Sequence, residues 1–183
     1  MILPFPGQSA PSAGFEVPLE MLAACHHRVE NQCQTLQRLV KHLAAHEVDH
    51  DARVAATAVL RYFDTAAKDH HADEETDLFP ALLESVPGSD PICIRELVES
   101  LIADHRTIEV QWQSLRPKLV AISAGEALVL AAADVDPLIA LYDQHIIREE
   151  AELLPMAARL LSDSTLDVIG RAMRVRRGLG DDE

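Results

Sequence analysis

The chain has 183 residues, of which 48% are hydrophobic, 4% are aromatic and 7 are glycine. This length suits one domain with a full core, and the abundance of leucine, alanine, glutamate and arginine favours helices over strands. The formal net charge of −14 argues against nucleic acids and membranes as partners, because phosphate backbones and anionic lipids repel an acidic surface.

The chain carries no evident targeting or membrane segment. The first 15 residues contain three prolines and no basic stretch, so they do not resemble a signal peptide. No uncharged apolar run reaches the roughly 18 residues that span a bilayer. The three cysteines, Cys25, Cys33 and Cys93, lack the paired spacing of a disulfide framework. These features predict a soluble cytoplasmic protein and leave open whether it forms a homodimer.

Residues 1–15 are rich in proline, glycine and serine, and we expect a flexible N-terminal arm there. Apolar residues then recur in steps of three and four, which is the pattern of a helix with one buried face. In the first helix this stripe runs through Leu19, Leu22, His26, Val29, Cys33, Leu36, Val40 and Leu43.

A second helix is predicted from about residue 51 to residue 85, with a kink or restart at Pro80. The third follows Pro91 and extends to about residue 122, with His105 on its apolar face. The fourth carries His145 and should bend at Pro155, and a short fifth helix should follow Ser164. The fold class predicted is therefore all-α: an up-and-down antiparallel four-helix bundle in residues 16–163, with a short extra C-terminal helix and tail in residues 164–183.

Two segments repeat one arrangement, "HHADEETDLFP" from His70 and "HIIREEAELLP" from His145. In each, a glutamate follows a histidine by four residues, and an apolar pair and a proline come next. Side chains four apart share a helix face, so each pair presents an imidazole and a carboxylate to one point. A similar match between "CHHRVENQCQTL" and "DHRTIEVQWQSL" indicates a duplicated pair of helices.

The pattern in the second helix leaves two choices, His70 with Glu74 or His71 with Glu75. Equal spacing to proline in the two repeats favours His70 and Glu74, and the other pair stays an alternative. A lone histidine on an apolar face is more often an ordinary core residue than a ligand, and a lone His-x-x-x-Glu is usually an exposed pair. The repeated set points to metal, because buried carboxylates need a strong compensating partner.

This arrangement resembles the hemerythrin-like, or HHE cation-binding, family over about residues 15–160. The resemblance implies a four-helix bundle around a non-haem di-iron centre, in which glutamates and an oxo or hydroxo group bridge the irons. Zinc or manganese would accept many of the same donors. The ligands implied by the resemblance are His26, His70, Glu74, His105, His145 and Glu149.

One position departs from the oxygen-carrying hemerythrins, whose third helix offers two histidines four residues apart. Residue 109 here is glutamate, which places reversible oxygen carriage in doubt. Glu109, and Glu30 in the same relation to His26, are candidates for a further ligand or for an outer group that orients a histidine.

The leading functional prediction is binding or sensing of dioxygen or related small ligands, such as peroxide and nitric oxide. One alternative is a di-iron enzyme acting on peroxide, nitric oxide or ferrous iron. The other is a metal-stabilised regulatory or adaptor bundle. Open-site di-iron chemistry supports both binding and turnover, so the residues alone do not separate the first two. The shortness of the flanking segments counts against a regulator with a separate output domain.

Overall fold

The computed structural model describes residues 14–86 and 91–180. Most of the predicted N-terminal arm, residues 1–13, and the last three residues lie outside this part. Within it the regular structure is helical: α1 (Pro18–Leu43), α2 (His50–Asp64), α3 (Ala66–Asp73), η1 (Glu74–Leu78), α4 (Phe79–Glu84), α5 (Pro91–Ala124), α6 (Ala132–Arg148), η2 (Glu149–Leu153), α7 (Leu154–Leu160) and α8 (Asp163–Arg176). No helix in the described ranges is both long and apolar enough to cross a membrane.

Local sequence explains where several helices begin and end. The Asp49 side chain accepts a hydrogen bond from the backbone N–H of Ala52 at 2.9 Å and so caps the start of α2. Ser162 caps α8 in the same way through the N–H of Thr165. At the end of α5, Gly125 has φ of +87°, a conformation that a residue with a side chain rarely adopts.

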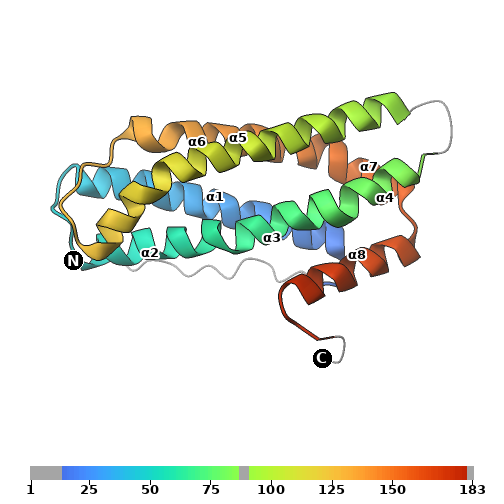
Figure 1. Cartoon of the computed structure of the whole chain (residues 1–183), viewed down its shortest axis with the longest axis horizontal. Helices are drawn as coiled ribbons and strands as arrows, with labels where there is room; N and C mark the ends of the chain where they lie inside the picture. The colour runs from blue at the N-terminus through green and yellow to red at the C-terminus, as the bar shows by residue number, and fades with distance from the viewer. Residues whose placement is uncertain (1–13, 87–90, 181–183) are drawn as a thin grey trace.

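Figure 1 shows four long rods running alternately up and down: α1, then α2 to α4, then α5, then α6 to α7. Each rod contacts the next along the chain, and α6 returns to contact α1, so the bundle closes around one interior. The predicted all-α fold, an up-and-down four-helix bundle with an extra C-terminal helix, is confirmed. α8 begins at Asp163, one residue inside the boundary predicted for the bundle.

The second and fourth rods contain helix irregularities that the sequence pattern predicted less accurately. The second rod is interrupted at Thr65, between α2 and α3, where a continuous helix was predicted. The disturbance expected at Pro80 and Pro155 takes the form of a wide π-helical turn just before each proline. Proline lacks the N–H for the usual bond to the carbonyl four residues back, and its ring crowds that carbonyl.

The bundle interior has an apolar cluster at each end. One cluster centres on buried residues such as Leu36, Phe63 and Leu119. The other includes Leu78 and Leu101 and extends to α8. Buried histidines and glutamates lie on helices that pass through both clusters. The apolar ends therefore hold the helices in place while polar side chains meet inside.

α8 packs across the second rod through a buried carboxylate. Asp73, which is fully buried, accepts hydrogen bonds from Arg176 at the end of α8 and from Arg177, which directly follows α8. Arg176 also donates to Asp77 at 2.7 Å. The C-terminal helix is thus tied to the second rod on both sides of Glu74, at Asp73 and Asp77.

Candidate metal centre

All six residues predicted as ligands lie inside the bundle, and none is more than 1% exposed. They come from all four rods: His26 from α1, His70 from α3, Glu74 from η1, His105 from α5, His145 from α6 and Glu149 from η2. The structure therefore brings together the complete set.

The histidine rings form two pairs, and the glutamates lie between the pairs. In the first pair, His26 Nε2 is 3.0 Å from Oε2 of Glu149, and His70 Nε2 is 3.4 Å from Oε1 of Glu74. In the second pair, His105 Nε2 is 3.3 Å from Oε2 of Glu74. The second member, His145, has Nε2 at 3.2 Å from Oε1 of Glu149. Each carboxylate thus directs one oxygen towards each histidine pair.

These close atoms do not satisfy one another as hydrogen-bonding partners. Both oxygens of Glu74, both oxygens of Glu149 and Nε2 of His26 are buried without a hydrogen bond. Unsatisfied buried polar atoms are rare in native proteins, and a buried carboxylate is costly without a partner. The donors converge in groups whose ligand atoms lie within 4.8 Å of one another. Nitrogen and carboxylate oxygen are donors that suit iron, zinc and manganese, so the residues fit bound cations.

The electrostatics of the site also favour cations. Burial raises the pKa of Glu74 well above its usual value, and the adjacent Glu149 raises it further. Burial lowers the pKa of His70 and His71 well below the ordinary value, and neighbouring histidines add to this effect. These two imidazoles are therefore neutral at physiological pH, which is the form that coordinates metal.

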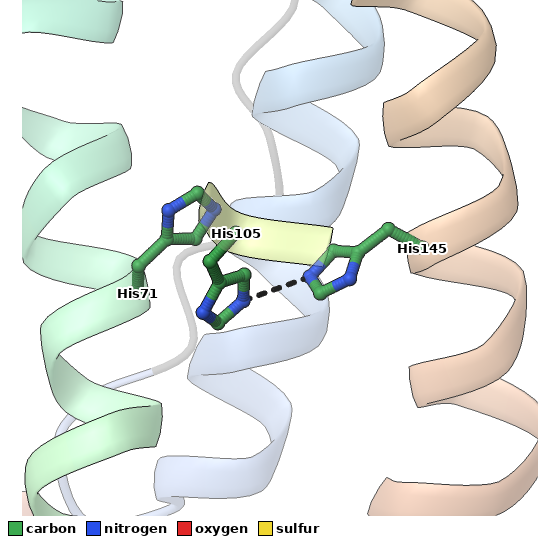
Figure 2. A group of neighbouring side chains, drawn as sticks. All are labelled: His71, His105 and His145. Atoms are coloured by element: carbon green, nitrogen blue, oxygen red, sulfur yellow. Dashed lines mark hydrogen bonds between the residues drawn. The ribbon is translucent and has the colours of Figure 1, made fainter. Parts of the chain in front are cut away.

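His71 also reaches the centre, although the sequence presented it as an alternative to His70. Its ring stacks on His105, with ring centroids 3.9 Å apart, and Nε2 is buried without a partner. Figure 2 shows His71, His105 and His145 converging from three helices, with a dashed line between the facing Nε2 atoms of His105 and His145. These three form a further group with metal-ligand spacing. The fifth imidazole thus comes from position 71, whereas position 109 holds glutamate.

The two π-helical turns begin at the two central glutamates. In η1 the N–H of Phe79 donates to the carbonyl of Glu74, five residues earlier. The N–H of Leu154 does the same to the carbonyl of Glu149 in η2. Each proline therefore widens its helix at the turn that presents a carboxylate, which explains why both repeats end in proline.

Neither acidic residue proposed as an additional ligand lies in the cluster. Glu30 is exposed and contacts Nδ1 of His27 at 3.2 Å. Glu109 is exposed and accepts a hydrogen bond from Gln113. Glu75 and Glu150 contact the rings of His105 and His26 from outside. The sequence had presented Glu75 only as an alternative ligand together with His71, and it had not indicated Glu150. The signal available was the second glutamate of the Glu-Glu doublet in each repeat.

A small cavity of about 20 Å³ adjoins His71. Tyr142 packs against Phe63 there, with ring centroids 5.5 Å apart, and Trp112 closes another side. The full lining is Phe63, Ala67, Lys68, His71, Ile108, Glu109, Trp112 and Tyr142. A space of this size holds about one water-sized molecule.

Comparison with known proteins agrees with this site. Residues 17–157 match the model of the hemerythrin HHE cation-binding domain. The chain is also 30% identical over 165 residues to an uncharacterized protein of Haemophilus influenzae, covering 90% of this chain and 92% of the relative. The chain belongs to the hemerythrin HHE cation-binding domain family, and its clustered histidines and glutamates make it a metal-binding helical bundle.

Proposed function

We propose that the protein holds a non-haem di-iron centre that binds or senses dioxygen or a related small ligand, such as peroxide or nitric oxide. The observation that carries this proposal is the division of the Glu74 and Glu149 oxygens between the two histidine pairs. Glu74 and Glu149 would each contribute an oxygen to both cations, and each cation would have nitrogen donors of its own.

Two cations account for the donor set better than one. His26 and His70 group with both glutamates, and His105 and His145 form a second group with the same glutamates. Carboxylate-bridged di-iron sites commonly occupy the cores of four-helix bundles. Iron is favoured within the family resemblance, and zinc or manganese would accept many of the same ligands. When bound, iron supplies redox-active positions for a diatomic or peroxide ligand.

The protein around the donors favours a small ligand. The cavity beside His71 measures about 20 Å³ and is walled mainly by Phe63, Ile108, Trp112 and Tyr142. Such walls admit a molecule of two heavy atoms more readily than an organic substrate.

Metal analysis of the purified chain, with optical spectra before and after exposure to air, tests the proposal. We expect two irons per chain and charge-transfer absorption that changes when oxygen or azide is added. His26→Ala should lower the iron content, whereas His27→Ala is the matched control, because His27 is exposed and pairs only with Glu30. One zinc per chain and a featureless spectrum would overturn the di-iron proposal. Turnover of peroxide or nitric oxide by the iron-loaded chain would extend binding to catalysis.

A further inference from the structure

His26 and His105 each contact an acidic side chain of the neighbouring rod through Nδ1, the ring nitrogen that faces away from the centre. We call these two the lone histidines, because no central glutamate follows them on their own helix. Nδ1 of His105 is 2.8 Å from Oε1 of Glu75, and Nδ1 of His26 is 3.1 Å from Oε1 of Glu150. Both rings are at most 1% exposed, whereas their outer partners are partly exposed. In each ring, Nε2 faces the central carboxylates and Nδ1 faces the outer one.

The contacts follow one rule in both halves. Glu74 points to the centre, and Glu75 reaches across to α5. Glu149 points to the centre, and Glu150 reaches across to α1. Consecutive residues on a helix differ in direction by about 100°, so a Glu-Glu doublet supplies one central carboxylate and one aimed at an adjacent helix. Glu75 in the first repeat and Glu150 in the second therefore occupy equivalent positions.

The remaining two paired histidines are held differently. His70 and His145 each lie four residues before a central glutamate on their own rod, which fixes the ring beside that carboxylate. Nδ1 of His70 has no hydrogen-bonding partner, and Nδ1 of His145 is 3.7 Å from Asp104. Glu75 and Glu150 thus contact His105 and His26, the two histidines whose own helices supply no central glutamate.

We propose that Glu75 and Glu150 are positioning residues of the metal centre. Each accepts the Nδ1–H hydrogen bond of a lone histidine, which fixes the tautomer with a free Nε2 and orients that atom towards the cation. The proposal rests on the metal centre described above and does not require that the metal be iron. A carboxylate on the outer nitrogen of a ligand histidine also increases the basicity of the ring.

The two outer carboxylates differ in one respect. Arg106 donates to both oxygens of Glu75, and its Nη1 lies 2.9 Å from Oε1. No lysine or arginine of the described residues forms an ion pair with Glu150, whose partner is His26. Glu75 is therefore fixed from two sides and partly neutralised, whereas Glu150 is held by its histidine. The Glu150 carboxylate should consequently donate more electron density to its ring.

Chelator competition with Zn²⁺ and, separately, Fe²⁺ tests the inference on the full-length chain. Removal of such an outer partner typically lowers metal affinity by about 10–100-fold. We expect Glu150→Ala and Glu75→Ala each to weaken one of two bound cations by this factor. Glu150→Gln and Glu75→Gln should restore part of the affinity, because the amide oxygen still accepts the Nδ1–H bond. Glu30→Ala is the matched control and should leave affinity unchanged, because Glu30 is exposed and contacts His27.

An NMR measurement on the Zn²⁺-loaded chain separates positioning from simple stabilisation of the fold. The Nδ1–H proton of His26 should be protected from exchange in the wild type and lose protection in Glu150→Ala, while that of His105 stays protected. Unchanged zinc affinity in both alanine variants would overturn the proposal. Equal weakening of both cations with no rescue by glutamine would also overturn it, since that outcome marks a general loss of structure. If zinc behaves as expected and iron does not bind, the positioning role stands and the di-iron proposal fails.

Discussion

Replacing Glu74 with methionine should stabilise the metal-free protein and should make the protein less stable than the wild type when metal is present. Both carboxylate oxygens of Glu74 are buried and have no hydrogen-bonding partner. Methionine has a similar length and contains no group that needs such a partner. Replacing buried ionic groups with apolar ones is often neutral or stabilising by about 1–4 kcal/mol. We therefore expect metal-free Glu74→Met to have a free energy of unfolding about 1–3 kcal/mol above that of the metal-free wild type.

With metal present, the order should change. A cation at about 100 times its dissociation constant stabilises the wild type by about 2.7 kcal/mol. Glu74→Met removes one of the two central carboxylates, so most of this gain should be lost in the variant. The assay is urea denaturation followed by far-ultraviolet circular dichroism, with and without a chelator.

Glu109→Met provides the matched control, because Glu109 is exposed and lies outside the cluster. Its free energy of unfolding should change by less than about 0.5 kcal/mol in either condition. The contrary result would be a metal-free Glu74→Met variant that is less stable than the metal-free wild type by about 1 kcal/mol or more. That result would mean that the protein alone satisfies the Glu74 carboxylate and that no cation is needed to compensate for its burial.

Three further changes probe other parts of the molecule. His70→Leu should remove one of two bound metal equivalents, whereas His71→Leu should retain both, because each histidine pair survives. Metal analysis and Mössbauer spectra of the iron-loaded protein distinguish these outcomes. Loss of a metal equivalent in His71→Leu would contradict the pairing. Asp73→Ala removes a buried carboxylate that Arg177, the residue after α8, contacts at 2.6 Å. The variant should therefore lower the free energy of unfolding by about 1–3 kcal/mol and speed proteolysis of α8. Unchanged cleavage would contradict this docking role. Leu36→Ala in the apolar cluster away from the metal ligands should cost about 2.7–5.0 kcal/mol in urea denaturation while leaving metal stoichiometry intact; a loss of metal from the folded variant would show that the two regions are coupled.

The repeated apolar steps were sufficient to predict the bundle and the inward faces of the first, third and fourth rods, whereas two choices remained open in the second rod. His26 and His105 continue the apolar stripes of their helices, so their burial follows from helical periodicity alone. The spacing of His145 and Glu149 likewise places both on one face. What periodicity does not provide is the identity of the neighbouring helix that a side chain contacts, because that depends on how the rods are arranged around the interior.

Position 71 illustrates this limit. The sequence presented His70 and His71 as alternatives, since adjacent residues point about 100° apart on a helix. In the folded bundle His70 lies near His26 and His71 stacks on His105, so the two rings approach the cluster from different sides. His70 and His71 exclude each other only if all the ligand side chains meet at a single point, and here they meet at two.

The sequence by itself predicted the fold class, the burial of four histidines and two glutamates and the chemistry of their donors, because these depend on residue type and on spacing along one helix; the burial of Asp73 was not predicted. The tertiary structure decided how the oxygens of Glu74 and Glu149 divide between histidine pairs, and that Glu75 and Glu150 reach the outer nitrogens of His105 and His26. It also decided that each proline produces a wide turn at a central carboxylate. These features arise from contacts between rods that are far apart in the chain, and helical periodicity contains no information about those distances.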